Sequence, residues 1–181
     1  MPLGGYGVAF MVALLIGSAS VGSTGLVAET RVAPGQHDAA VARTVGGMIS
    51  YTRWPVERAV LNICVSGATA YAGGLGRIDD LIGRHVEARR LPPGNPAQNC
   101  DVLYLGTMGT ADRQRVMRSI RDRPVLSIAE ADPDCRGGTI FCLQVMPDRI
   151  GFRLSIDAVS RSAVRIDPRV LRIALPEGGA G

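Results

Sequence analysis

The chain has 181 residues, of which 46% are hydrophobic, and its formal net charge is +4. This composition excludes an intrinsically disordered chain, because it supplies enough apolar side chains to bury a core. All 20 basic residues are arginine, and their positive charge is spread along the sequence. A modest, dispersed charge gives no electrostatic reason to expect nucleic-acid binding.

The first 28 residues are typical of an export signal. No charged side chain occurs in 7–28, an apolar core occupies 8–16, and small residues follow it. Cleavage could follow Ala19 or Ala28, and we favour Ala28 because charged residues begin at Glu29. The sequence thus predicts a signal peptide over 1–28 and a periplasmic protein. An uncleaved membrane anchor is the alternative, since 8–28 is just long enough to span a bilayer.

Beyond a flexible lead-in at 29–37, the sequence predicts one domain over 38–176 and a tail at 177–181. Apolar residues recur at helical spacing in its first segment, which must end near Trp54 because a proline follows. The next segments are, in order, a strand at 59–65, a helix within 67–82, an outer strand at 85–91 and a buried strand at 101–106.

After one more helix and strand, the order of elements changes from alternating strands and helices to two consecutive strands. A helix is expected over 110–122 with Thr110 as its N-cap, followed by a strand at 124–129. Two strands at 139–146 and 149–157 are joined by Pro147-Asp148, which predicts an antiparallel hairpin. Short closing helices are expected at 158–164 and 168–174.

This order of elements predicts an α/β fold. It comprises a mixed, mostly parallel sheet of about six strands with helices on both faces and an antiparallel C-terminal hairpin.

The four cysteines give the most specific structural prediction that this sequence allows. In an exported protein, Cys64, Cys100, Cys135 and Cys142 read as two disulfides, for which three connectivities exist. We prefer Cys64–Cys100 with Cys135–Cys142, because the proline-rich loop at 91–99 could fold back and the second pair is only seven residues apart. A nested pairing, which would link the hairpin to the first strand, stays open.

No constellation of catalytic or metal-binding residues is present in the sequence. The two histidines, His37 and His85, have no partner at metal-ligand spacing, and no Cys-x-x-Cys occurs. Gly73-Gly74-Leu75-Gly76 lacks the lysine of a phosphate-binding loop and is interpreted as a helix boundary. We therefore expect no enzyme activity and no cofactor.

Five arginines lie close together in 113–123 and could bind phosphate or an acidic partner. A solvated helix face is the favoured interpretation, because no aromatic residues alternate with them.

Several short motifs, taken in order, resemble the YfiR-like family (DUF4154). They are Tyr51-Thr52-Arg53-Trp54-Pro55, Ile63-Cys64-Val65, the segment CDVLYLG at 100–106, PVLSI at 124–128, GGTIF at 137–141, FRLSI at 152–156 and VLRIA at 170–174. The resemblance covers nearly the whole chain after the apolar start. The chain departs from the family pattern at Gly46-Gly47-Met48-Ile49, where aromatic residues are usual.

The resemblance implies a periplasmic homodimer with the two preferred disulfides. It also implies a repressor that binds the periplasmic sensor domain of a membrane diguanylate cyclase and lowers cyclic di-GMP, which controls biofilm formation and motility. Release by an outer-membrane lipoprotein or by disulfide reduction is expected to relieve this inhibition.

Trp54 and Arg53 are the candidate partner-binding residues, because Trp and Arg are enriched at interface hot spots. A core role for Trp54 is the alternative. Two other functions stay open. One is a small-ligand-binding module that uses a crevice at the carboxyl ends of the parallel strands. The other is a thiol-redox protein with a reactive free cysteine.

Overall fold

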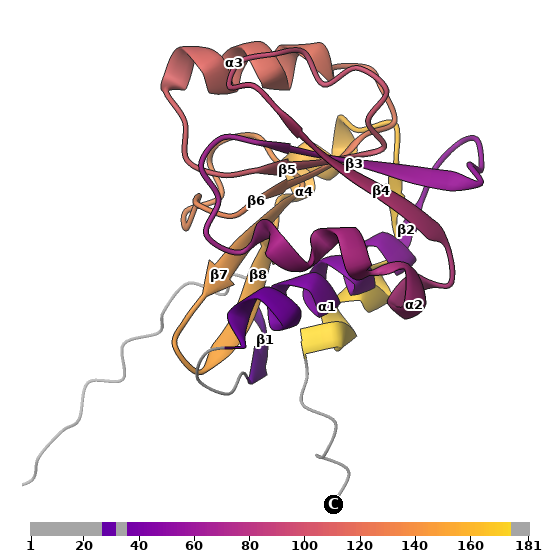
Figure 1. The fold of residues 1–181 in the computed structure, drawn as a ribbon, viewed down its shortest axis with the longest axis vertical. Helices are drawn as coiled ribbons and strands as arrows, with labels where there is room; N and C mark the ends of the chain where they lie inside the picture. Colours follow the sequence, from indigo (N-terminus) through magenta and orange to yellow (C-terminus); the bar gives the residue numbers. More distant parts are fainter. Residues whose placement is uncertain (1–26, 32–35, 175–181) are drawn as a thin grey trace, which may run out of the picture.

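The computed structural model describes residues 27–31 and 36–174, in which seven strands form one sheet (Figure 1). Their order across the sheet is β1-β8-β7-β6-β5-β3-β4. The strands are β1 (Val27–Arg31), β3 (Val60–Ser66), β4 (His85–Leu91), β5 (Val102–Leu105), β6 (Leu126–Ala129), β7 (Phe141–Val145) and β8 (Arg149–Leu154).

The sheet is mixed and mostly parallel, which confirms the predicted fold class. Strands β4, β3, β5, β6 and β7 run parallel, whereas β7 and β8 form the predicted antiparallel hairpin. All side chains of β5 and β6 are buried, as expected for central strands that are covered on both faces. Strand β4 lies at the edge and is mostly exposed and charged, which discourages pairing with another chain.

Strand β1 was not predicted and adds a seventh strand to the expected six. It pairs antiparallel with β8, from Val27 opposite Arg153 to Arg31 opposite Arg149. The strand lies across the expected boundary between the signal peptide and the lead-in. A cut after Ala28 would separate two of its five residues from the rest of the strand.

Helical segments cover both faces of the sheet, as predicted. Helix α3 (Thr110–Ser119) lies alone over one face, and α1 (His37–Ser50) and α2 (Asp79–Ile82) lie over the other (Figure 1). Two 3-10 helices, η1 (Ala72–Arg77) and η2 (Pro168–Ala174), both contact α1. The two layers bury separate apolar clusters. The larger cluster lies on the α1 side and includes Phe141 and Phe152, whose rings meet edge to face at 5.4 Å.

The helix expected within 67–82 is replaced by the short segments η1 and α2. The glycines in this stretch allow α1 to approach closely, since a Cβ on Gly74 would lie 2.8 Å from the carbonyl oxygen of Asp38. The same glycines lower helix propensity by about 1 kcal/mol each relative to alanine. Tight packing against α1 therefore decides the local structure here.

Two expected helix ends are also corrected. Thr110 is the first residue of α3 and not its cap, because Gly109 occupies the N-cap position and no side chain makes a capping bond. The first closing helix, α4 (Ile156–Ser160), begins two residues earlier than predicted, because Ser155 caps it by accepting a hydrogen bond from the amide of Ala158.

A second, two-stranded sheet was not predicted. Strand β2 (Thr52–Arg53) follows α1 directly and pairs antiparallel with β9 (Arg165–Ile166). This pairing brings the Trp-Pro segment next to the C-terminal part of the chain, which is more than 100 residues away in the sequence.

Candidate interaction surface

The segment after α1 is held rigidly by its first residues. Thr52 is buried and its hydroxyl donates to the carbonyl oxygen of Met48 at 2.7 Å. The amide of Asp167 donates to the carbonyl oxygen of Tyr51 at 2.9 Å, next to the β2–β9 pairing. The chain therefore leaves α1 in a fixed direction, and this direction positions Arg53 and Trp54.

Trp54 is half-buried, so its role is intermediate between the core and interface roles considered above. One part of the ring packs against the larger apolar cluster. The indole Nε1 donates to the main-chain oxygen of Asp101 at 3.3 Å, which ties the segment to the start of β5. The rest of the side chain is accessible, and the neighbouring Val56 is 68% exposed.

Asp101 is the centre of this arrangement, and sequence reasoning did not identify it. Its carboxylate is nearly buried and pairs with Arg58 Nε at 2.9 Å. The other carboxylate oxygen accepts hydrogen bonds from the Asn62 amide at 2.9 Å and from Asn62 Nδ2 at 3.3 Å. A buried carboxylate needs such partners, because desolvating an unpaired charge costs several kcal/mol. The only sequence signal was an acidic residue directly before an apolar strand.

The disulfide between Cys64 and Cys100 places Asp101 at this position. Cys64 lies inside β3, two residues after Asn62, and its Cα is 5.7 Å from that of Cys100. The proline-rich loop before Cys100 thus folds back onto β3, as the preferred pairing required. Because Asp101 directly follows Cys100, the disulfide fixes the carboxylate beside Asn62.

The accessible part of this region is basic with an apolar centre. We define the Trp54 surface by two apolar and four basic side chains, which are Trp54, Val56, Arg53, Arg58, Arg165 and Arg169. Arg53 lies opposite Arg165 in the β2–β9 pairing, so two positive charges meet there. Two negative charges lie in the same region, that of the exposed Glu57 and that of Asp167, which forms an ion pair with Arg169 at 2.6 Å.

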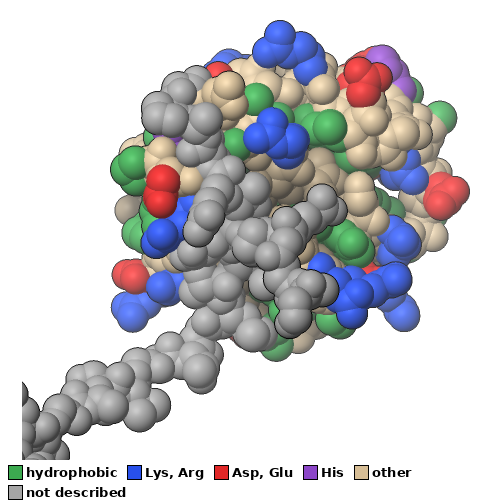
Figure 2. All heavy atoms as spheres, turned by 90° about the horizontal axis from the view of Figure 1, so that it is seen from below, with side chains coloured by type: hydrophobic (Ala, Val, Ile, Leu, Met, Phe, Trp, Pro, Cys, Tyr) green, Lys and Arg blue, Asp and Glu red, His purple; other side chains and the backbone are tan. Residues whose placement is uncertain are grey.

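On the face over α1 and η2, basic side chains are distributed among acidic and uncharged ones (Figure 2). No single basic patch dominates this view of the described residues, which agrees with the dispersed charge of the sequence.

The carboxyl group of Asp167 is expected to have an unusually low pKa. Measuring this pKa tests the geometry of the basic side chains in the Trp54 surface. The side-chain and main-chain hydrogen bonds from Arg169, helped by the charge of Arg53, lower the carboxyl pKa from 3.8 to about 2. The ion pair therefore adds stability above about pH 4, and this contribution is lost as the pH falls through 2. An NMR titration of the carboxyl carbon should show this, and Arg169→Ala should return the pKa towards 3.8. Arg172→Ala, which removes an exposed arginine in η2, should leave it unchanged.

The carboxyl ends of the parallel strands are filled by the chain itself. Ala68 and Thr107 form a two-way main-chain bridge there, with N–O distances of 2.9 and 2.8 Å. Gly106 is required at this point, because a Cβ would collide with the carbonyl oxygen of Ala68. The loop after β3 thus lies against the end of β5, at the edge where a small-ligand crevice was expected.

A buried tyrosine and a glutamate complete this closed edge. The Tyr104 hydroxyl donates to Glu130 at 2.7 Å, and Glu130 also accepts from the amides of Ala70 and Tyr71. Burial, and then the charge of Glu130, raise the pKa of Tyr104, so the phenol stays protonated as a donor. These groups act as structural ties between β5, β6 and the covering loop.

The histidines and cysteines have structural partners. His37 Nε2 lies 3.1 Å from the main-chain oxygen of Met146, and His85 Nδ1 lies 2.9 Å from Asp79. Cys135 is bonded to Cys142, with Cα atoms 5.4 Å apart, so this disulfide also has the preferred pairing. With both pairs formed, the described residues hold no free thiol.

Residues 27–31 and 36–174 contain no group of three metal-ligating side chains, and none of their helices is long and apolar enough to cross a membrane.

The sequence model of the YfiR/HmsC-like family, DUF4154, matches residues 38–175. The chain belongs to this family. YfiR/HmsC-like proteins are periplasmic and regulatory rather than catalytic, and they are associated with the control of membrane diguanylate cyclases. Membership accounts for the Trp-Pro segment, the cysteine-bearing strand and the hairpin occurring in this order.

The chain also resembles parts of two larger solved structures. A phosphoserine aminotransferase from Cytophaga hutchinsonii is 10% identical, with a TM-score of 0.44, 75% of this chain covered and 41% of that chain. A putative O-acetylhomoserine (thiol)-lyase from Campylobacter jejuni is 15% identical, with a TM-score of 0.46 and coverages of 73% and 37%. This chain therefore spans about two fifths of their length, and the likeness carries no conclusion about its function.

Proposed function

We propose that this YfiR/HmsC-like protein is exported with a cleaved signal peptide and restrains an inner-membrane diguanylate cyclase by binding its periplasmic sensor domain. The protein binds the inactive state of the cyclase more tightly than the active state and so shifts the cyclase population, which lowers cyclic di-GMP. The family match over 38–175 is the observation that carries the proposal.

The Trp54 surface is the proposed contact with the cyclase. A partly exposed tryptophan that is fixed at one end is a suitable anchor, because little conformational entropy is lost when it is buried further. The arginines around it favour an acidic rim on the partner, which would speed association and set the orientation. Val56 extends the apolar centre beyond the indole ring.

The assembly and the release step belong to the same proposal. We propose that the protein acts as a homodimer and that an outer-membrane lipoprotein, or reduction of a disulfide, releases the cyclase. Loss of Cys64–Cys100 would leave only hydrogen bonds between Asp101 and Asn62 of β3, and would loosen the main-chain oxygen that holds the Trp54 indole.

A crosslinking pull-down from the native host tests the proposal with the full chain as bait. The wild-type protein should capture a membrane protein with a cytoplasmic cyclase domain. Trp54→Ala and the charge reversal Arg53→Glu should lose it, and intracellular cyclic di-GMP should rise to the level of a gene deletion. Sequencing the amino terminus of the recovered bait shows whether the leader is removed.

Ile156→Ala is the matched control, because this isoleucine is 65% exposed on α4 and is not part of the Trp54 surface. It should keep both the capture and the low cyclic di-GMP level. Circular dichroism of the purified variants shows whether Trp54→Ala still folds, and the exposed Arg53 variant tests binding even if it does not. Unchanged cyclic di-GMP in a gene deletion would contradict the proposal.

A further inference from the structure

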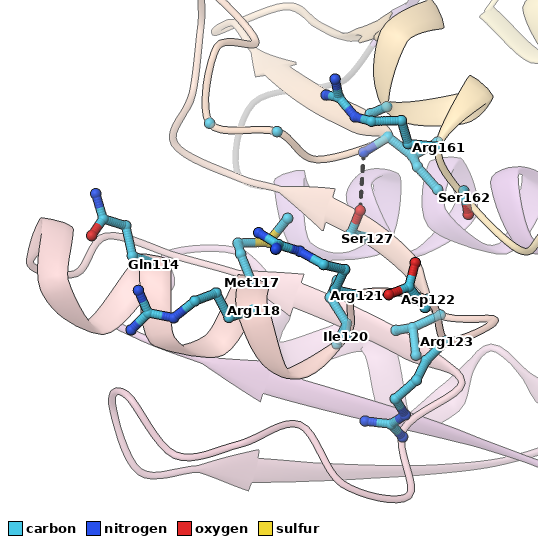
Figure 3. Close-up of a pocket in the computed structure, with 15 residues that line it drawn as sticks. Gln114, Met117, Arg118, Ile120, Arg121, Asp122, Arg123, Ser127, Arg161 and Ser162 are labelled. Atoms are coloured by element: carbon cyan, nitrogen blue, oxygen red, sulfur yellow. Dashed lines mark hydrogen bonds between the residues drawn. The ribbon is translucent and has the colours of Figure 1, made fainter.

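A hollow of about 850 Å³ lies at the amino ends of β6 and β7 (Figure 3). One wall is the second half of α3 and the turn that follows it. The opposite wall is the glycine-containing loop before β7 together with the end of α4. Its volume is within the usual range for small-molecule sites.

Apolar side chains line the inner part of this hollow, next to polar groups. Met117 and Ile120 come from the α3 side, Val125 from the start of β6, and Ile140 and Ala158 from the opposite wall. All of them except the half-buried Met117 are nearly fully buried. An apolar group that enters the hollow would therefore leave water for a hydrocarbon surface.

The rim of the hollow is positively charged. Four arginines line it against a single carboxylate, that of Asp122. Arg123 donates to the carbonyl oxygens of Ala97 and Ser119, and Arg161 pairs with Asp157, so these two guanidinium groups are already engaged.

Arg118 and Arg121 differ from the other arginines of this region, because neither guanidinium group has an ion-pair or hydrogen-bond partner among the described residues. By contrast, Arg113 is paired with Asp132 and Arg115 with Asp112 on the same helix. Both side chains line the hollow; in Figure 3, Arg121 reaches over Met117 towards the side of Ser127 and Arg161, whereas Arg118 extends along α3. Two guanidinium groups are therefore available to a ligand at the mouth of the hollow.

The wall opposite α3 is held in place before any ligand arrives. Asp132 accepts hydrogen bonds from the amides of Arg136 and Gly137 and from Arg113, which binds the loop to α3. The disulfide Cys135–Cys142 closes the same loop, and the Ile140 amide donates to the buried Ser127 hydroxyl at 3.0 Å. A preformed wall reduces the ordering cost of binding.

We propose that this hollow binds a small amphipathic anion, with its carboxylate or phosphate head on Arg118 and Arg121 and its apolar body against Met117, Ile140 and Ala158. Guanidinium groups suit both head groups because they donate two parallel hydrogen bonds. The proposal is independent of the cyclase, since none of these residues belongs to the Trp54 surface.

Calorimetric titration of the full chain with decanoate, and separately with decyl phosphate below its micelle concentration, tests the site. Both probes should bind once per chain, and the tighter one identifies the preferred head group. The double variant R118Q/R121Q should weaken binding by at least about tenfold, since charge-assisted hydrogen bonds are lost. Added salt should weaken binding to the wild type more than binding to this variant.

The control variant R43Q/R172Q removes the same charge from exposed positions on α1 and η2, across the sheet from α3, and should bind as the wild type does. Equal weakening in this variant would overturn the proposal, because it would show a general charge effect. Neutral decanol binding as tightly as decanoate would also overturn it, as would no binding of either anion at millimolar concentration. Thermal melting checks that both variants fold.

Discussion

Replacing Cys64 and Cys100 together by serine should lower the unfolding free energy of the oxidised protein by about 4 kcal/mol. The bond spans 36 residues, and closing a loop of that length removes a corresponding entropy from the unfolded chain. Both sulfur atoms lie in the smaller apolar cluster beneath α3, so the serine hydroxyls would also be poorly solvated. Chemical denaturation of the purified domain measures the change.

The second disulfide provides the matched comparison. Cys135–Cys142 closes a loop of only seven residues, so its removal should cost about 2.5 kcal/mol. The prediction is contradicted if this second pair proves the more important of the two for stability. Binding by the two variants should differ as well, because only the first disulfide positions Asp101 and the Trp54 surface.

Asp101→Ala should destabilise the protein by about 2–4 kcal/mol and abolish cyclase binding. The substitution leaves the Asn62 amide and side chain without their shared acceptor, and unsatisfied polar groups in such places cost about 1–3 kcal/mol each. The segment that carries Trp54 would also lose its link through Arg58. Denaturant unfolding and the pull-down described above measure the two effects.

Arg58→Ala separates the parts of this network. Its guanidinium is 57% exposed, and exposed ion pairs contribute about 0–1 kcal/mol, so this variant should unfold almost as the wild type does. If Arg58→Ala and Asp101→Ala were equally destabilising, the ion pair rather than the bonds to Asn62 would hold the segment. That result would contradict the role assigned to Asp101 as a buried acceptor.

The sequence determined the strands best where burial is complete. The apolar runs that became β3, β5 and β6 have no alternative to a covered sheet. Turn residues at Pro147-Asp148 placed the hairpin. These signals are local, and local signals are what one sequence carries most clearly.

The sequence was less informative where distant segments meet. Strands β1, β2 and β9 are short and gain their stability by pairing with segments that are remote in the chain, and no periodicity marks such pairings. Likewise, the glycines of η1 indicated a helix boundary but not the close approach of α1 that makes them necessary.

The candidate sites show the same division between local and distant information. Composition and motif order pointed to an exported regulatory protein of the YfiR-like family, to two disulfides and to Trp54. Only the tertiary structure brought Asp101 and Asn62 beside the Trp-Pro segment, joined the loops after β3 and β5, and placed Arg118 and Arg121 at the rim of a hollow. The physical reason is that a buried hydrogen bond or a pocket depends on atoms from several elements, whose relative positions are set by packing and not by any one segment.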